Sequence, residues 1–579
     1  MARIYSRWFH ILLLLAWLII GISLRLTNLS GKSPWTDEFS TLVFSLGNSF
    51  LGVPLNQAIT VDTLLHPLQP NPQAGVSDVL THLFTESNHP PIYFVLTHLW
   101  LKLFSTNAGL VSVWGARLLA AIFGGLSIPA IFGLSWLTFR SRLIAHLAAA
   151  MMAVSPFGIF LAQEARHYTL AILWVITSLA CLIIALRHIH NRTQLPIHIA
   201  LCWVIVNALG IATHYFFALT LCAEVFVLIF TIWQEWRNKN RVVEKGNFNF
   251  LSNLFGSPWK RIYAVALGTF IAGIVWVPIF ISNSYGDDLT DWIQGERVGF
   301  AWISPIFQAI AAWITMISLL PVEASQLAVV IASGLVMIIF FVWLIPILIR
   351  GYKLQLLSPQ NQLIVRALSS FILGAIILFF IFTYFLGIDL TRGARYNFVY
   401  FPAVMVLVGA ILAAIWDTNA ENIRWGVAGK QAVAIILLMG FISSITVVCN
   451  LGYQKYYRPD LFVKLIEKTS QNPVLIATTQ KTHVQIGEMI GVAREFKLGY
   501  SNQSSNQSSN QNPKFLLAHQ KKDRKAATIT LQNTLKTLSQ PIDLWLVNFH
   551  APAEVNNCVA DERALPSIDG YEYKLLHCK

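Results

Sequence analysis

Long apolar blocks, separated by short polar stretches, fill the first 450 residues of the chain. A helix needs about 20 mostly apolar residues to cross the hydrocarbon core of a bilayer, and most of the blocks approach that length. The pattern predicts a mainly α-helical, polytopic membrane domain. After Phe9–Leu24 the blocks lie at about 113–137, 143–161, 168–186, 196–213, 216–233, 262–282, 301–320, 325–349, 367–387, 396–416 and 431–449.

The composition agrees with a membrane protein. Only 12% of the residues are charged and 55% are hydrophobic, whereas a soluble domain carries about 25% charged residues. The net charge of +13 does not indicate nucleic-acid binding, because cytoplasmic loops of membrane proteins collect Lys and Arg to set the orientation. We therefore exclude nucleic acid as a partner.

Residues 451–579 have a different character and predict a small soluble α/β domain. "PVLIATT" (473–479) and "IDLWLVNF" (542–549) are typical of buried strands, and residues 483–496 have helical apolar spacing. Residues 501–512 form a low-complexity polar loop. The chain thus divides into a membrane domain, 1–450, and an extracytoplasmic domain, 451–579. No phosphate-binding Gly-rich loop, Gly-x-Ser-x-Gly motif or metal-spaced His/Cys cluster occurs.

The cysteines fall into two groups. Cys181, Cys202, Cys222 and Cys449 lie in apolar blocks and are interpreted as small core residues. Cys558 and Cys578 could form a disulfide if the tail is exported to an oxidising compartment. The N-terminal run lacks a small-residue cleavage site, so we expect an uncleaved first span.

The topology depends on "NHPPIYFVLTHLWLKLF" (88–104), which is apolar but short for a span. If this segment crossed, the basic stretches near 139–142 and 236–261 would fall outside; if it lies on the outer surface, they fall inside. The same reasoning makes 301–320 re-entrant or interfacial. We therefore predict about eleven spans, an inner N-terminus, an outer loop 27–112 containing juxtamembrane helices, and an outer C-terminal tail.

With this topology, several polar side chains gather at the outer ends of the spans. Charged residues are costly at spans and tend to mark function, although the cost is lower near helix ends. Their convergence on one face is the stronger signal for a site. The residues are Asp37, Glu38, His89, Glu164, Arg166, His214, Tyr215, Arg392 and Arg395.

Five local patterns contain these residues: "WTDEFSTLVFS" (35–45), "HPPIYFVLTHLW" (89–100), "QEARHYTLAIL" (163–173), "THYFFAL" (213–219) and "RGARYNFVYFPAVMVLVGAIL" (392–412). In their order and spacing, over roughly the first 415 residues, the chain resembles the protein O-mannosyltransferase-like family, glycosyltransferase family 39. That family has the C-type membrane glycosyltransferase fold and also includes bacterial aminoarabinose lipid A transferases. No single pattern is specific, and the tail carries no recognised motif.

The resemblance implies an enzyme that takes a sugar from a polyprenyl-phosphate carrier at the outer face of a membrane, here the bacterial plasma membrane. It implies that Asp37 is catalytic with Glu38 beside it, and that His89 and the pair Arg395–Tyr396 lie near the carrier phosphate. A carboxylate can take the proton of the acceptor, while Arg or His stabilises the leaving phosphate. Direct displacement would invert the anomeric centre.

The sugar stays open, as do the acceptor (lipid, glycan or protein) and a divalent metal as cofactor. We place Glu164, Arg166, His214 and Tyr215 among the substrate-binding residues. The alternatives are a structural ion pair between Glu164 and Arg166, and turn residues at His214 and Tyr215.

Competing functions are a lipid or polysaccharide transporter or flippase, and a polysaccharide ligase or polymerase. A transporter would show repeated halves and charges at the membrane midplane, whereas here no internal repeat is found and the charges lie at one face. A long first outer loop with Asp-Glu argues against the ligase or polymerase.

Overall fold

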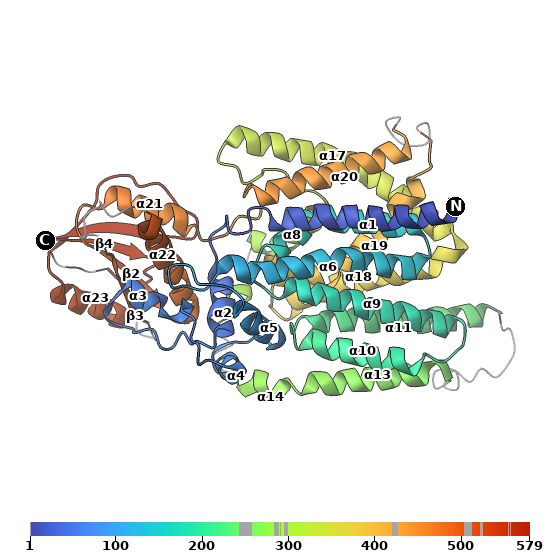
Figure 1. Ribbon diagram of the computed structural model, residues 1–579, viewed down its shortest axis with the longest axis horizontal. Helices are drawn as coiled ribbons and strands as arrows, with labels where there is room; N and C mark the ends of the chain where they lie inside the picture. Colours follow the sequence, from blue (N-terminus) through green and yellow to red (C-terminus); the bar gives the residue numbers. More distant parts are fainter. Residues whose placement is uncertain are drawn as a thin grey trace.

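The computed structural model describes residues 2–242, 257–282, 289, 291–294, 299–419, 427–502, 512–520, 525–553, 555 and 557–579. Figure 1 shows a bundle of long helices with a smaller domain containing the sheet at one end, and the N-terminus at the opposite end. The predicted mainly α membrane domain with a small C-terminal α/β domain is confirmed.

Eight helices in the described part of the chain are long and apolar enough to cross a membrane, or nine if the bent pair α7–α8 counts as one span. α7 (Arg142–Val154) and α8 (Pro156–Ala162) meet at 57°, where Pro156 starts the second helix. α10 (Ile197–Ile211) and α19 (Phe401–Ile415) are apolar but shorter, so eleven spans stays a prediction. The eight are α1 (Ala2–Leu26), α6 (Val113–Phe139), α9 (Tyr168–His190), α11 (Phe217–Val242), α13 (Ser257–Ile274) running into α14 (Val277–Ser282), α17 (Leu327–Leu357), α18 (Pro359–Phe385) and α20 (Gly429–Val448).

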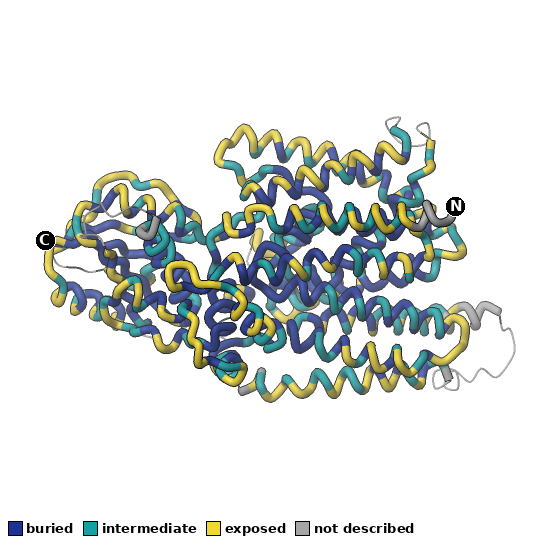
Figure 2. Tube along the Cα trace, in the orientation of Figure 1, coloured by how far each residue is buried: buried dark blue, intermediate teal, exposed yellow. Residues whose placement is uncertain are grey.

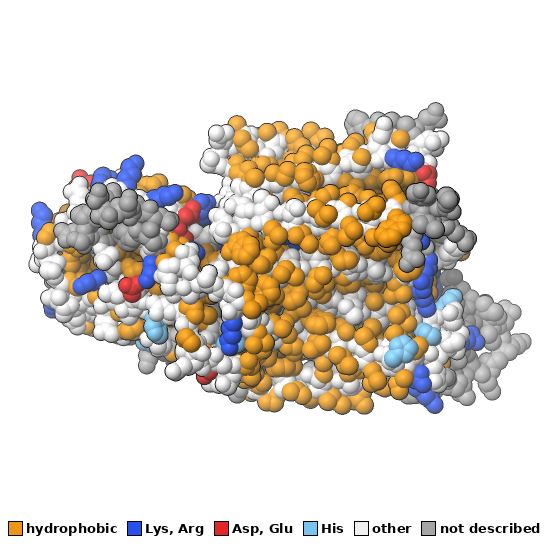
Figure 3. Space-filling model, in the orientation of Figure 1, with side chains coloured by type: hydrophobic (Ala, Val, Ile, Leu, Met, Phe, Trp, Pro, Cys, Tyr) orange, Lys and Arg blue, Asp and Glu red, His pale blue; other side chains and the backbone are white. Residues whose placement is uncertain are grey.

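Burial separates inner from outer helices of the bundle. α7 and α19 lie in its middle and are largely buried, whereas α13 and α17 expose many apolar side chains (Figure 2). Figure 3 shows these apolar side chains as a broad surface over the bundle, with Lys and Arg gathered at the end that holds the N-terminus. A broad apolar belt around the helices is what a membrane-spanning bundle requires.

Residues 27–112, predicted to be the first outer loop, contain short helices at the end of the bundle that meets the C-terminal domain (Figure 1). They are α2 (Thr36–Ser45), α3 (Val61–Leu65), α4 (Val76–Glu86) and α5 (Ile92–Leu101). α5 starts directly after Pro91 and has 10 residues, or about 15 Å at 1.5 Å per residue, which is half the hydrocarbon thickness. The predicted juxtamembrane helices are confirmed. α16 (Ser304–Ile317), with 14 residues, is also too short to span upright.

The C-terminal domain is built on a six-stranded sheet of order β1-β3-β2-β4-β6-β5. β2 (Val474–Gln480) pairs in parallel with β3 (Lys514–His519) and β4 (Ile542–Val547), and β6 (Tyr573–Cys578) and β5 (Cys558–Ala560) add antiparallel at one edge. The other edge strand, β1 (Ala58–Thr60), comes from the first outer loop and pairs antiparallel with β3. The sheet therefore joins both ends of the chain.

Helices cover both faces of this sheet. α22 (His483–Asn502) packs on one face, with Ile486, Met489 and Ile490 in a core shared with Ile476 and Trp545. α21 (Pro459–Thr469), which precedes β2, packs with α22 on this face, and α23 (Lys525–Thr537) covers the other face. Burial on both faces explains why β2 and β4 are continuous apolar runs. The two predicted strands and the predicted helix are confirmed; most of the polar loop 501–512 lies outside the described residues.

Cys558 and Cys578, whose pairing the sequence left open, form a disulfide between paired positions of β5 and β6. Of the four cysteines in apolar blocks, Cys181 is buried as expected. The expectation was wrong for Cys202, Cys222 and Cys449, which are exposed. The geometry of the bundle explains this, because a helix at its periphery buries one face and exposes the other, and these cysteines lie on exposed faces.

Candidate functional site

The predicted site residues meet where the bundle faces the C-terminal domain. Asp37 and Glu38 occupy the first turn of α2, where the partial positive charge of a helix N-terminus favours carboxylates. Arg166 lies between α8 and α9, and Arg395 lies in the 3-10 helix η5 (Ala394–Val399) before α19. Segments far apart in sequence thus contribute to one site.

Two guanidinium groups flank the carboxylate of Asp37. Oδ2 lies 3.4 Å from Nη2 of Arg395 and 3.5 Å from Nη2 of Arg166. Arg166 also donates to the backbone oxygen of Asp37 (2.9 Å) and to the hydroxyl of Thr41 (3.1 Å), which fixes its position against α2. The Asp37 side chain is 30% exposed, so a substrate can reach this carboxylate.

Arg395 is held by aromatic rings. Its guanidinium carbon lies 4.6 Å from the ring centroid of Trp35, 5.3 Å from that of Trp292 and 5.4 Å from that of Tyr396. Such contacts favour Arg over a compact ammonium.

Three buried donors around Asp37 make no hydrogen bond with any residue that the structure describes. They are Nε of Arg166, Nε of Arg395 and the indole N–H of Trp35. A buried donor without a partner costs about 1–3 kcal/mol, so such donors call for a ligand or ordered water. An anionic ligand with several oxygens, such as a phosphate, fits this set.

His89 supports Arg166. Its Nε2 lies 2.9 Å from Nη2 of Arg166, and its Nδ1 lies 3.0 Å from the hydroxyl of Ser87. An arginine can only donate, so Nε2 accepts and the ring proton resides on Nδ1. Burial, together with the charge of Arg166, lowers the pKa of His89 well below its ordinary value. His89 is therefore a neutral acceptor that orients the guanidinium.

Glu38, predicted beside Asp37 as a catalytic residue, lies in a different environment. It is fully buried, and its two oxygens accept from Nε and Nη2 of Arg117 at 2.8 Å each. Oε1 also accepts from the backbone N–H of Ala165 at 2.8 Å. Burial alone would raise the pKa of Glu38, but the charge and hydrogen bonds of Arg117 outweigh it and lower the pKa to about 2. This carboxylate ties α2 to α6 and is closed to solvent.

Glu164 and Arg166 do not pair, so the alternative of an ion pair between them is wrong. Glu164 forms an ion pair with Lys455 from the linker after α20, while Arg166 turns to Asp37. The segment between α8 and α9 is a tight turn in which the N–H of Arg166 donates to the backbone oxygen of Glu164. Two such close residues point their side chains to different neighbours.

His214 and Tyr215 lie in the turn between α10 and α11. Nδ1 of His214 accepts from the backbone N–H of Phe216 at 3.0 Å, as a turn residue does. The His214 ring also stands edge-on to His167, with centroids 4.4 Å apart, and His167 lies 5.5 Å from His89. The imidazole rings of His214, His167 and His89 thus form a row from the turn to Arg166. The phenol ring of Tyr396 lies beside His214 at the start of this row.

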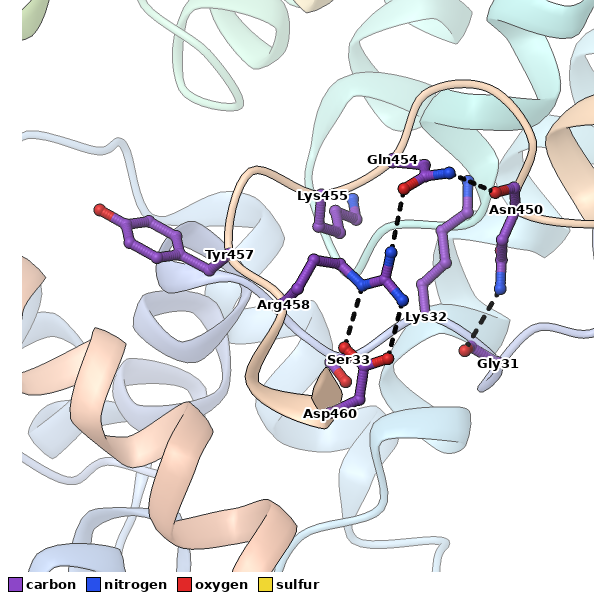
Figure 4. Close-up of a pocket in the computed structure, with 9 residues that line it drawn as sticks. All are labelled: Gly31, Lys32, Ser33, Asn450, Gln454, Lys455, Tyr457, Arg458 and Asp460. Carbon is purple, nitrogen blue, oxygen red and sulfur yellow. Dashed lines mark hydrogen bonds and ion pairs between the residues drawn. The ribbon is translucent and has the colours of Figure 1, made fainter. Parts of the chain in front are cut away.

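A polar pocket lies beside the site and shares Lys455 with its surroundings. Lys455 places its ammonium 5.4 Å from the Trp35 centroid, the ring that also contacts Arg395. In Figure 4 the side chains of Lys32, Lys455 and Arg458 converge there. Burial lowers the pKa of Lys32 to about 7, and the neighbouring Lys455 adds to the effect. Gly31, Ser33, Asn450, Gln454, Tyr457 and Asp460 complete the lining.

Sequence reasoning missed Arg117, His167 and Lys455. An arginine inside an apolar block is a signal that could have identified Arg117, because such a charge requires a buried partner. His167 lies inside the pattern 163–173, between Arg166 and Tyr168, but was not singled out, and Lys455 carries no distinguishing local pattern. Within the described ranges, no group of three or more His, Cys, Asp or Glu side chains is arranged to hold a metal ion.

In sequence, the chain matches no family model and no curated protein. Among solved structures it is similar to ArnT from Cupriavidus metallidurans, at 12% identity over 99% of this chain and 98% of that one. The TM-score is 0.46 for the form bound to undecaprenyl phosphate and 0.49 for the apo state.

It is also similar to the oligosaccharyltransferase AglB from Archaeoglobus fulgidus in complex with an inhibitory peptide and a dolichol-phosphate. There the identity is 12% and the TM-score 0.44, over 94% of this chain and 70% of that one. At identities and TM-scores this low, similarity to these structures does not establish the function of this chain.

Proposed function

We propose that this protein is a membrane glycosyltransferase that takes a sugar from a polyprenyl-phosphate carrier and passes it to a lipid, glycan or protein acceptor. The observation that carries the proposal is the partly exposed carboxylate of Asp37 between Arg166 and Arg395. The unsatisfied donors beside it suit the leaving phosphate, and three of the five sequence patterns described above, 35–45, 163–173 and 392–412, contribute these residues.

The proposed reaction is a single displacement at the anomeric carbon. Asp37 takes the proton of the acceptor hydroxyl, whose oxygen forms the new bond to that carbon. The bond from the carbon to the phosphate oxygen breaks, and its electron pair stays on the released polyprenyl phosphate. Arg395 and Arg166 stabilise the negative charge that develops there. Attack opposite the leaving group inverts the configuration.

Glu38 has a positioning role in this proposal. Its carboxylate is saturated by Arg117 and Ala165, so it holds the first turn of α2 and leaves proton transfer to Asp37. Arg392 is 42% exposed and lies 3.6 Å from Asp389, so we assign it no contact with the carrier phosphate in this proposal.

We further propose that the site and the C-terminal domain face the outside of a bacterial plasma membrane. The basic end of the bundle, opposite this domain in Figure 3, supports the orientation. Cysteines introduced at Asn88 and Thr106 should both react with a membrane-impermeant reagent added from outside. If the cysteine at Thr106 reacted only after permeabilisation, the segment between the two positions would cross the membrane, and the proposed path of the chain would be wrong.

One observation favours a transporter as the second candidate. Glu224 is buried within α11 and hydrogen-bonds Ser178 (2.7 Å) and Trp203 (3.2 Å), and buried carboxylates in membrane segments often mark transport paths. A ligase or polymerase remains the third candidate, without an observation of its own.

Transfer in nanodiscs separates these functions. The purified protein would receive radiolabelled synthetic polyprenyl-phosphate sugars and an envelope extract as acceptor source. If the protein is a glycosyltransferase, label should appear in a new covalent product. This product should be lost in Asp37→Asn and should still form in Glu224→Gln. If the intact donor instead moved between leaflets without forming a product, and Glu224→Gln abolished that movement, the protein would be a transporter and the proposed transferase function would be wrong.

A further inference from the structure

One stripe of α22, from the C-terminal domain, lies directly on α2, the helix that carries Asp37. Gly487 and Gly491 are one turn apart on α22 and face α2. A Cβ atom added at Gly487 would lie 3.6 Å from Cα of Thr36, and one added at Gly491 would lie 3.4 Å from the ring of Phe39. Such backbone proximity requires a small side chain.

The same stripe continues in both directions along α22. One turn before Gly487, the ring of His483 stacks on Phe50 at 5.0 Å and 15° and meets Phe44 edge-on at 5.8 Å. Phe44 contacts Phe94, which in turn contacts His89, so aromatic packing is continuous from α22 to the partner of Arg166. One turn after Gly491, Glu495 accepts from the hydroxyl of Ser33 at 3.2 Å.

α2 is therefore held from two sides. On the bundle side Glu38 binds Arg117 of α6; on the opposite side lies the stripe of α22. Asp37 is adjacent to both Thr36 and Glu38, so its position depends on both contacts. Burial lowers the pKa of His483 to about 4, and Asp37 opposes this through its charge, which places the two groups in electrostatic reach.

We infer that the C-terminal domain is part of the catalytic unit, with the α22 stripe His483–Gly487–Gly491 as a positioning element that sets the place of Asp37 on α2. This inference rests on the proposed function of Asp37. A displacement of a catalytic group by about 1 Å can cost about 10²-fold in rate. The stripe should therefore control turnover and leave donor binding to Arg166 and Arg395.

Docking can be tested without any activity. In the variant Thr36→Cys/Gly487→Cys, the two Cβ atoms would lie 3.7 Å apart, within the usual range of about 3.5–4.5 Å for a disulfide. We expect this pair to cross-link on oxidation in the full-length protein in nanodiscs. Thr36→Cys/Gly499→Cys is the matched control, because a Cβ at Gly499 has no neighbour within 4 Å. Equal cross-linking of both pairs, or of neither, would overturn the docking.

Turnover of the cross-linked protein then tests positioning. If the docked arrangement is the working one, the oxidised and reduced forms of Thr36→Cys/Gly487→Cys transfer sugar at the same rate, with the wild type plus reductant as control for the native disulfide. If oxidation abolished transfer and reduction restored it, the docked state would be an inactive one, and the inference would be overturned.

Side-chain size at Gly487 gives the second measurement. Gly487→Ala fits the ordinary contact distance and should keep normal transfer, whereas Gly487→Leu must push α22 away and should lower kcat by about 10²-fold with unchanged donor affinity. Normal kcat in Gly487→Leu would overturn the inference. If the wild type transfers no sugar, the proposed function fails, while the cross-link still reports docking.

Discussion

Asp37→Asn separates the two roles that the site gives to this carboxylate, proton acceptor and partner of two arginines. The amide keeps the size of the side chain but cannot take a proton from the acceptor. A positioned base contributes about 10²–10⁴-fold in rate, so kcat should fall by this factor, which corresponds to about 3–5 kcal/mol of barrier.

Although Asp37→Asn should lower the rate of transfer, it should raise the affinity for the donor. In the free protein, Oδ2 of Asp37 lies 3.4 Å from Arg395 and 3.5 Å from Arg166, and the donor phosphate competes with it for these guanidinium groups. A pair that includes a partly exposed carboxylate is worth about 0.2–1 kcal/mol. Removing both pairs should tighten donor binding by at most about 2 kcal/mol, or roughly thirtyfold in Kd.

The assay combines single-turnover transfer with equilibrium binding of the same labelled polyprenyl-phosphate sugar in nanodiscs. Asp62→Asn is a matched control, because Asp62 is a 72% exposed carboxylate of the first outer loop that pairs with Lys497. Turnover of Asp37→Asn within about threefold of the wild type would contradict the rate effect of a general base. Weaker donor binding would show that the carboxylate holds the guanidinium groups in place for the phosphate.

Three other predictions follow from contacts of single side chains. Glu38→Gln breaks a fully buried ion pair and should cost about 3–5 kcal/mol of stability, measured as a lower Tm that Asp37→Asn does not show. Arg395→Ala should weaken donor use far more than Arg392→Ala, and Arg395→Lys should restore part of it; equal effects in donor titrations would remove Arg395 from the site. The Asp543 carboxylate raises the pKa of His577, so this contact stabilises the C-terminal domain below about pH 6.5 and is lost as the pH rises through the raised pKa. Tm measured against pH should therefore fall on the alkaline side in the wild type, and this dependence should flatten in His577→Gln.

Sequence reasoning predicted the architecture well where a single physical constraint acts. Apolar length identified most of the long helices. The positive-inside rule predicted that 88–104 does not cross, and the helix in this segment, α5, has only 10 residues. Burial on both faces made β2 and β4 recognisable as apolar runs. Each of these signals is local or depends on the charge of short loops.

Partnership between side chains could not be predicted in the same way. Asp37 and Glu38 are neighbours in sequence, but helix geometry points one to the arginines of the site and the other to Arg117. The same limit hid Lys455, which reaches Glu164 from the linker after the last span. Such contacts depend on the packing of distant segments, which neither periodicity nor composition encodes.

The edge strand β1 has a consequence for biosynthesis. Ala58 pairs with Leu516, so more than 450 residues, including every candidate span after α1, separate the two strands along the chain. At about 5–20 residues per second of translation, the segment containing β1 waits roughly 20–90 s before its partner strand is made. During that time its N–H and C=O groups are open to other strands. The protein is therefore expected to depend on chaperones that hold this segment while the rest of the chain is being made.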